Sequence, residues 1–145
     1  MINMVIGEKI TLSPIKKEDH EFLFELLEQR KPLVNISHKR MPTWEEHVKF
    51  VKSRPYLKWY VVIYDGIKIG SIYLSKQNEI GIHFLKKFEI DSLYLNTIKE
   101  LMKKNPKKRF LANVSPKNRK YTKYFQNLGF KMIQHTYELD LRRKF

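Results

Sequence analysis

Hydrophobic residues recur along the chain with two periods, one typical of strands and one typical of helices. Alternating or continuous apolar runs predict strands at residues 9–15, 58–64, 67–74, 79–85, 109–114, 130–134 and 136–141. Apolar stripes with three- and four-residue spacing predict helices at residues 18–30, 44–54 and 93–104, and a last helix capped by Ser115 and ended by Gly129. The order β-α-α-β-β-β-α-β-α-β-β predicts an α/β (α+β) architecture, with a mixed sheet and helices on both faces.

Local signals support several of these boundaries. Thr43 is followed three residues later by Glu46, which is a capping box at a helix start. The pair Asp65-Gly66 between two apolar runs predicts a tight hairpin. The strand–helix–strand step across residues 79–114 requires a parallel strand pair and a right-handed crossover. The last strand is expected to turn one row of side chains inward: Tyr137, Leu139 and Leu141.

Composition narrows the class of protein. The chain has 145 residues, 42% of them hydrophobic, so residues 1–145 are expected to form a single domain with one core. No apolar run approaches the roughly 20 residues of a membrane span. There is no cysteine, which excludes disulfides, thiolate metal sites and a cysteine nucleophile. These features predict a cytoplasmic protein that does not contact a membrane. The sequence has no H-x-x-x-H motif and no carboxylate cluster, so no metal site is expected.

Positive charge is concentrated in the second half of the chain. The net charge is +14, and residues 86–131 contain thirteen Lys or Arg against three acids, Glu89, Asp91 and Glu100. A field of that sign attracts phosphate groups, whether on a cofactor, a nucleotide-linked substrate or a nucleic acid. The alternative interpretation is that these residues only keep the protein soluble.

Residues 78–101 combine a strand, a short charged loop and a helix. A strand that leads into a helix presents free backbone N–H groups and a partial positive charge at the helix start. This arrangement predicts an anion seat, suited especially to phosphate.

The C-terminal half carries a family resemblance. Asn118, followed by Phe125-Gln126-Asn127-Leu128-Gly129-Phe130, resembles a signature of the GNAT superfamily of acyl-CoA N-acyltransferases. The hairpin from Asp65-Gly66 to Ile69-Gly70 is similar to the second and third strands of that family. With the element order above, the resemblance extends from about residue 9 to residue 141 and implies a GNAT-like fold.

The resemblance also implies coenzyme A binding, with acetyl-CoA as co-substrate. In the family, the fourth strand and the helix after it hold this cofactor. The positions that match are His83, Phe84, Leu85, Lys86, Lys87, Ser92 and Asn118.

One motif departs from the family pattern. The diphosphate loop Q/R-x-x-G-x-G/A aligns with residues 89–94, where Glu89 replaces the basic or amide position and Tyr94 replaces a glycine. Tyr94 is expected to crowd the diphosphate, and the acids to repel it. Lys86, Lys87 and Ser92 are expected to compensate in part.

A general base is expected on the fourth strand. The resemblance implies a carboxylate there, and Glu79 is the acid of that strand. His83 lies on the same side of the strand by alternation and titrates near neutral pH. Four residues separate them by about 13 Å, so they are alternatives or a base and a substrate contact. Both also have structural interpretations, as an exposed acid and a packed histidine.

A tyrosine acid for the departing thiolate is implied by the resemblance, but its usual position holds Phe125. Tyr121 shares the Phe125 face of the helix and is the better substitute, whereas Tyr124 lies about 100° round the helix and is expected to face solvent. Residues that the resemblance places in the acceptor pocket are Asn35, His38 and Trp44. Their alternative roles are loop polarity for His38 and helix packing for Trp44.

Three functions are consistent with these features. The first is an N-acetyltransferase that moves an acetyl group from acetyl-CoA to a primary amine of a small acceptor, with an amino sugar as one candidate. The second is a GNAT-like protein that has lost coenzyme A and binds nucleic acid or another polyanion through its basic surface. The third is an acetyltransferase for a protein or ribosome-associated amine.

Overall fold

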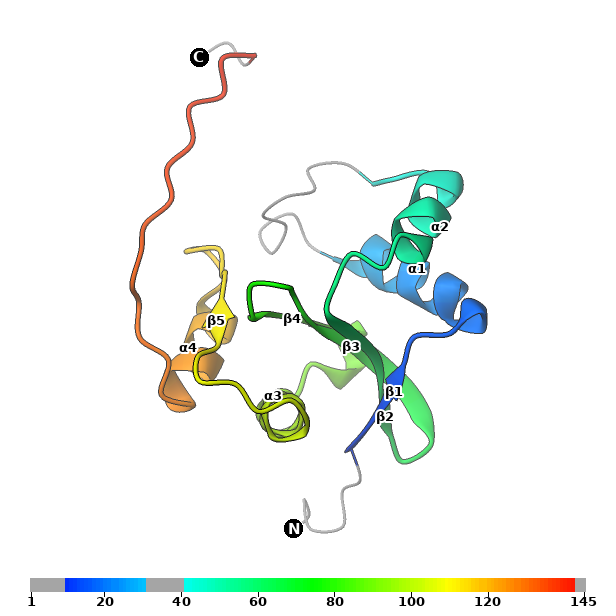
Figure 1. The fold of residues 1–145 in the computed structure, drawn as a ribbon, viewed down its shortest axis with the longest axis horizontal. Helices are drawn as coiled ribbons and strands as arrows, with labels where there is room; N and C mark the ends of the chain where they lie inside the picture. Colours follow the sequence, from blue (N-terminus) through cyan, green and yellow to red (C-terminus); the bar gives the residue numbers. More distant parts are fainter. Residues whose placement is uncertain (1–9, 31–40, 143–145) are drawn as a thin grey trace.

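A five-stranded mixed sheet lies at the centre of the structure (Figure 1), which is a computed structural model describing residues 10–30 and 41–142. The strand order in the sheet is β1-β2-β3-β4-β5. The first three neighbouring pairs are antiparallel, and β4 pairs with β5 in parallel. This confirms the predicted mixed sheet and its parallel step. The strands are β1 (Ile10–Pro14), β2 (Lys58–Tyr64), β3 (Ile67–Leu74), β4 (Glu79–Phe84) and β5 (Leu111–Ala112).

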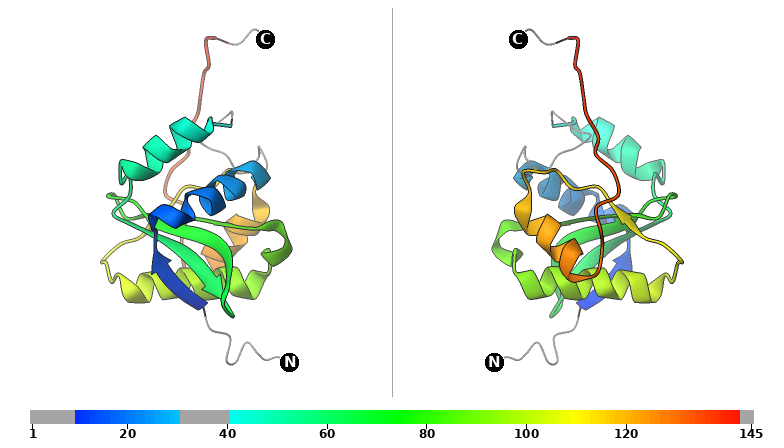
Figure 2. Two further views of the ribbon diagram at one scale, coloured as in Figure 1. Left: turned by 90° about the vertical axis from the view of Figure 1, so that its right-hand side faces the viewer. Right: turned by 90° about the vertical axis from the view of Figure 1, so that its left-hand side faces the viewer.

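Helices cover both faces of the sheet, as predicted (Figures 1 and 2). Helices α1 and α2 pack on one face of the sheet, and helices α3 and α4 pack on the opposite face. Two short 3-10 turns, η1 and η3, precede α1 and α3. The bounds are η1 (Lys17–Asp19), α1 (His20–Gln29), α2 (Trp44–Lys52), η3 (Lys86–Phe88), α3 (Asp91–Lys104) and α4 (Arg119–Asn127).

The alternation of β4 divides its side chains between these two layers. Ile80, Ile82 and Phe84 are buried in the larger core, beside α3 and α4. His83 therefore projects toward the α1 and α2 side, where a smaller cluster contains Leu23 of α1 and Val51 of α2. One strand thus supplies both the core and the residues of a site.

The capping box and the hairpin form as predicted. The Thr43 hydroxyl accepts the Glu46 N–H, and the Glu46 carboxylate accepts the Thr43 N–H at 2.8 Å. Asp65 and Gly66 have φ values of 51° and 78°, which is the left-handed backbone that a two-residue hairpin needs. These elements are set by local sequence.

The last helix starts later than predicted. Ser115 does not cap it, because the helix begins at Arg119 and Asn118 is its N-cap. The Asn118 side chain accepts the Tyr121 N–H at 3.2 Å. An Asx residue two positions after Pro116 offered the stronger cap. The preceding strand is also shorter than predicted, with Leu111 and Ala112 alone in the ladder.

The two strands predicted at residues 130–134 and 136–141 are wrong. The segment is not part of the sheet, and Figure 1 shows it leaving the body after α4. Tyr137, Leu139 and Leu141 do not face inward, since they are 88%, 71% and 83% exposed. A strand forms only where a neighbour completes its hydrogen bonds, and no described strand of this chain lies beside the segment.

We expect Ile72→Ala to lower the free energy of unfolding by about 2–5 kcal/mol, because this side chain is fully buried in β3. Ile67→Ala is the matched control in the same strand, since Ile67 is 51% exposed, and it should cost under about 1 kcal/mol. Urea denaturation of the three proteins measures both values. Equal losses would contradict the position of the core.

Candidate active site

The pairing of β4 with β5 stops before β4 ends. The last paired residues are Ile80 and Ala112, whereas β4 continues to Phe84. The Leu85 N–H donates to the Ile69 carbonyl. The backbone N–H and C=O groups of the odd-numbered residues of β4 therefore point toward β3 in the antiparallel ladder. The backbone groups of Ile82 and Phe84 therefore point toward the side that β5 has left.

Tyr121 of α4 reaches this point of divergence. Its hydroxyl donates to the Ile82 carbonyl at 2.9 Å and lies 3.2 Å from the Tyr94 hydroxyl. Burial raises the pKa of Tyr121 to about 12, so the hydroxyl keeps its proton at neutral pH. Tyr121 can therefore donate a proton beside the open edge of β4.

Tyr124 is placed differently. It is 4% exposed, so the expectation that it faces solvent is wrong. Its hydroxyl donates to the Asp91 carboxylate at 2.6 Å, at the start of α3, and burial raises its pKa. Tyr124 thus ties α4 to α3, while Tyr121 is the tyrosine that touches β4.

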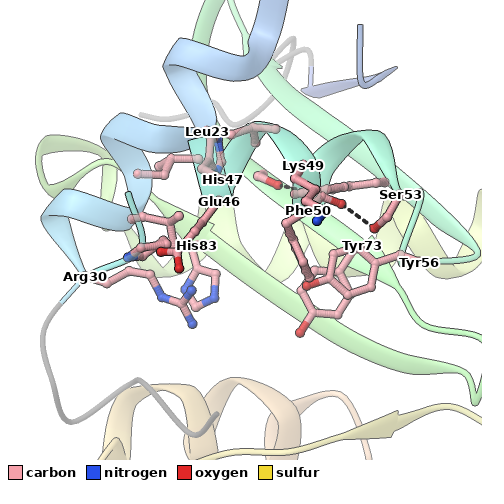
Figure 3. A pocket seen from close by; sticks show the side chains of 15 residues that line it. Leu23, Arg30, Glu46, His47, Lys49, Phe50, Ser53, Tyr56, Tyr73 and His83 are labelled. Carbon is pink, nitrogen blue, oxygen red and sulfur yellow. Dashed lines mark hydrogen bonds between the residues drawn. The ribbon is translucent and has the colours of Figure 1, made fainter. Parts of the chain in front are cut away.

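A pocket of about 610 Å³ lies on the other face of β4 (Figure 3). It is bounded by α1, α2, the loop after α2 and strands β2, β3 and β4. Figure 3 shows Arg30 and His83 side by side at one end, with Phe50, Tyr56 and Tyr73 at the other. The pocket thus has a basic end and an aromatic end.

The basic end holds two half-buried nitrogen side chains, those of Arg30 and His83. Burial, assisted by the nearby Arg30 charge, holds the pKa of His83 well below its usual value. Burial also lowers the pKa of Arg30, and its Nε has no hydrogen-bond partner among the described residues. His83 is therefore neutral near pH 7 and able to accept a proton, beside a cation whose Nε has no partner among the described residues.

The aromatic end is built on a glycine. The rings of Tyr56 and Tyr73 stack in parallel, with centroids 3.7 Å apart, and Phe50 meets Tyr56 edge-on. A Cβ at Gly81 would lie 2.1–2.4 Å from Tyr73 side-chain atoms. Because Gly81 has no Cβ, the Tyr73 ring of β3 can lie directly over it on β4.

Glu79 lies apart from this pocket. Its carboxylate accepts from the Ser75 hydroxyl at 3.1 Å and from the Asn113 amide at 2.9 Å. Those partners hold it at the start of β4, and it does not line the pocket with His83. The two candidate bases thus occupy separate places, as their spacing in the strand predicts.

The loop before α3 closes on itself. Within η3 and the residues after it, Phe88, Glu89 and Ile90 donate their N–H groups to Leu85, Lys86 and Phe88 carbonyls. The Lys86 N–H donates to the Gln29 side chain at 3.0 Å. These amides are therefore occupied, and the side chains of Lys86 and Lys87 are exposed at the surface of the loop.

Tyr94 does not enter this loop. Its ring is 1% exposed and stacks on Phe84 with centroids 4.2 Å apart. Its side chain points into the core, and the expected crowding of a diphosphate stays a prediction. Ser92 is half-buried in the first turn of α3, where helix N–H groups lack internal partners.

The remaining predicted residues have varied positions. Asn118 is buried as the α4 cap, and Leu85 is buried against the α1 and α2 layer. Trp44 is 42% exposed, packs edge-on against Phe24 and lines a separate pocket on the outer side of α1. Asn35 and His38 lie outside the described residues.

Sequence reasoning missed three residues of the pocket: Arg30, Tyr56 and Tyr73. Arg30 ends a helix and Tyr56 lies in a loop, so neither belongs to a periodic pattern. Tyr73 had a signal, because a glycine inside a strand often marks close approach of a neighbour. Gly81 is such a residue, and Tyr73 is its partner across the ladder.

The described residues contain neither a candidate metal centre nor a candidate membrane span. Residues 10–30 and 41–142 contain no cluster of three or more His, Cys, Asp or Glu that could hold a metal. In the same part of the chain, no helix is both long and apolar enough to cross a membrane.

Comparison with solved structures identifies the fold. No known family model and no curated protein matches the sequence. A domain from Methanocaldococcus jannaschii is similar, with a TM-score of 0.72, 24% identity and coverage of 91% of this chain and 94% of that one. A ribosomal L7/L12 alpha-N-protein acetyltransferase in complex with coenzyme A is similar with a TM-score of 0.72 and 16% identity. The match covers 86% of this chain and 81% of that one. An aminoglycoside N-acetyltransferase in complex with coenzyme A is similar with a TM-score of 0.66 and 17% identity. The match covers 99% of this chain and 100% of that one. The chain shares the fold of these acetyltransferases, which confirms the GNAT-like fold that the sequence resemblance implies.

We expect His83 to make stability depend on pH. The unfolded chain protonates this histidine below about pH 6.5, whereas the folded protein resists protonation, so stability should fall as pH falls from 6.5. The contribution to the slope is at most about 1.4 kcal/mol per pH unit. His83→Gln should reduce the slope of the unfolding free energy between pH 7.5 and 5 in urea titrations.

The matched control is His135→Gln, because that side chain is exposed. It should leave the slope unchanged. An unchanged slope in His83→Gln would show that His83 is not buried in its neutral form.

Proposed function

We propose that this protein is an acyl-CoA-dependent N-acyltransferase of the cytoplasm, which moves an acetyl group from acetyl-CoA to a primary amine of a small acceptor. The observation that carries the proposal is the divergence of β4 from β5. It places a half-buried proton donor, Tyr121, on one side of β4 and a pocket with a neutral His83 on the other. Two acetyltransferases with a similar fold were solved in complex with coenzyme A, which supports the choice of cofactor.

The chain fits coenzyme A better at the strand than at the loop. The Ile82 N–H and the backbone N–H and carbonyl of Phe84 point away from β3, toward the side where an extended amide chain could pair with β4, whereas the Ile82 carbonyl already accepts from Tyr121. At the loop, most main-chain N–H groups are already bonded within it. We therefore assign the diphosphate to the side chains of Lys86 and Lys87 and to the first turn of α3 near Ser92.

The residues divide the proton transfers between them. Acetyl-CoA supplies a thioester whose acetyl group joins the acceptor nitrogen as the carbon–sulfur bond breaks. His83 accepts a proton from the acceptor amine, because its imidazole is neutral and lines the pocket. Tyr121 provides a proton to the departing thiolate, since burial keeps its hydroxyl protonated. Glu79 is the alternative base, acting through water from the start of β4.

The pocket suits an amino sugar. Its volume accommodates a small molecule, and the stacked Tyr56 and Tyr73 rings offer a flat apolar surface for the carbon face of a sugar. The Arg30 charge in the pocket, whose Nε has no partner among the described residues, favours an acceptor that also carries an anionic group, such as a phosphate. Among the similar structures, one is an aminoglycoside N-acetyltransferase, which is consistent with an amino-sugar acceptor.

The competing function is a binding module for nucleic acid or another polyanion. The observation in its favour is the closed loop before α3, because amides bonded within the loop do not bind a diphosphate. It predicts binding to transfer RNA or a duplex that weakens steeply with salt, and no binding of acetyl-CoA.

Isothermal titration calorimetry with millimolar acetyl-CoA tests the proposal first. We expect binding to the native protein, and none would favour the polyanion function. With an accepted amine in hand, His83→Gln should lower kcat by about 10²–10⁴-fold, because a general base is lost. Glu79→Gln is the companion variant and should change kcat far less. The reverse ranking would make Glu79 the base.

Arg30→Gln should selectively weaken the use of anionic acceptors. We expect kcat/KM for glucosamine 6-phosphate to exceed that for glucosamine in the native protein, and the variant to lose about 30-fold of that preference, because a buried charge pair is broken. Lys52→Gln removes the same charge from an exposed position outside the pocket and should keep the preference. An equal preference in all three proteins would exclude Arg30 as the anion contact.

A further inference from the structure

Three tyrosine side chains meet between α3 and α4, beside β4: Tyr94, Tyr121 and Tyr124. The centroid of the Tyr94 ring lies 5.3 Å from that of Tyr121 and 4.9 Å from that of Tyr124. Tyr124 uses its hydroxyl on the Asp91 carboxylate at 2.6 Å. The hydroxyls of Tyr94 and Tyr121 lie 3.2 Å apart. The hydroxyl of the proposed acid is therefore bonded to that of Tyr94, while the Tyr124 hydroxyl is engaged elsewhere.

The direction of this hydrogen bond follows from the number of protons. A phenol hydroxyl has one proton to donate. Tyr121 gives its proton to the Ile82 carbonyl at 2.9 Å, so its oxygen accepts from Tyr94. Tyr94 is 1% exposed, and a buried hydroxyl that donated to nothing would cost free energy, so the Tyr121 oxygen within reach satisfies it. The proton of Tyr94 therefore points at the oxygen of Tyr121.

The Tyr94 hydroxyl is held in place from both ends of the residue. Its backbone N–H donates to the Ile90 carbonyl in the first turn of α3, and its ring stacks on Phe84 with centroids 4.2 Å apart. A donor fixed in this way needs little reorganisation when negative charge develops on its acceptor. The family pattern has a glycine at this position, and a glycine would leave the Tyr121 oxygen without this donor.

We propose that Tyr94 is a positioning residue whose hydroxyl holds the Tyr121 oxygen in place and stabilises it as it becomes a phenolate. This inference rests on the proposed function, in which Tyr121 protonates the departing thiolate. A hydrogen bond to an ionised acceptor is roughly twice as strong as one to a neutral acceptor. The bond from Tyr94 therefore strengthens as Tyr121 gives up its proton, which favours the transfer.

The proton transfer balances with Tyr94 as a bystander that keeps its own proton. As the acetyl group joins the amine, the electron pair of the carbon–sulfur bond stays on sulfur. The Tyr121 O–H bond breaks, an S–H bond forms, and the negative charge moves to the Tyr121 oxygen. Burial raises the pKa of Tyr94, so it donates a hydrogen bond and does not ionise. Solvent returns a proton to Tyr121 as His83 releases the proton that it took from the amine.

Other titratable groups face Tyr121 from the elements around it: Glu89, Arg30, His83 and Tyr124. Burial is the main cause that raises the pKa of Tyr121 to about 12, and the Glu89 charge adds to this rise. The Tyr94 hydrogen bond and the Arg30 charge oppose it. The histidine and Tyr124 are uncharged near neutral pH. Of these groups, Tyr94 is the one whose proton is directed at the Tyr121 oxygen.

Fluorine NMR tests the hydrogen bond without any turnover. A fluorinated tyrosine incorporated in place of Tyr121 reports its own ionisation, and fluorine acidifies the phenol so that the titration needs less extreme pH. Tyr94→Phe should raise this pKa by about 1–2 units, because a hydrogen bond to the charged form is lost while the stacked ring is kept. Tyr124→Phe is the matched control, since its hydroxyl bonds to Asp91, and it should shift the pKa far less. Equal shifts in the two variants, or no shift in Tyr94→Phe, would overturn the proposal.

The leaving group separates this role from a merely structural one. With acetyl-CoA, Tyr94→Phe should lower kcat by about 3–30-fold, because a weaker acid transfers its proton less readily. With the nitrophenyl thioester of acetic acid, whose thiolate departs without a proton, the variant should keep the native rate. A loss of folded protein would lower both rates equally, so equal losses with both thioesters would overturn the proposal. No transfer from either thioester by the native protein would instead overturn the proposed function, and the fluorine titration would still decide whether Tyr94 donates to Tyr121.

Discussion

The end of strand pairing after Ile80 is the constraint on which the candidate site depends. Had β5 followed β4 to Phe84, the carbonyl of Ile82 would bond to the ladder, and α4 could not reach it. The divergence instead lets the Tyr121 hydroxyl take that carbonyl from the side of α4. The alternation of β4 then places His83 toward the opposite layer, with the pocket. A short parallel ladder thus separates a proton donor from a proton acceptor across one strand.

Burial assigns the roles of these two groups. It lowers the pKa of His83, because the charged imidazolium loses hydration and meets the Arg30 charge. It raises the pKa of Tyr121, because the charged phenolate loses hydration in the same way. Environments that push two pKa values apart leave a free base and a protonated acid at the same pH. The cost of this arrangement lies in Arg30, a half-buried cation whose Nε has no partner in the described part of the chain.

Sequence reasoning succeeded where local chemistry determines structure. The capping box at Thr43, the hairpin at Asp65-Gly66 and the alternation of β4 each depend on neighbours in the chain, and each was predictable. It failed where a distant partner decides. Residues 130–141 have a strand pattern but lack a neighbour, and Tyr94 faces the core because Phe84 stacks on it. Arg30 and Tyr56 line the pocket through tertiary packing that no periodicity reveals.

The closed loop before α3 changes how an anion would be held. A glycine-rich loop offers fixed amide groups, whose position does not depend on side-chain freedom. Here the amides of Phe88, Glu89 and Ile90 bond within the loop, so the remaining positive groups are the flexible side chains of Lys86 and Lys87. Exposed charges are screened by salt, with a Debye length of about 8 Å at physiological ionic strength. A diphosphate held in this way would be bound more weakly, and with more dependence on salt, than one held by a main-chain cradle. The departure of this loop from the family pattern therefore concerns the strength of cofactor binding, whereas the chemistry proposed for His83 and Tyr121 depends on β4.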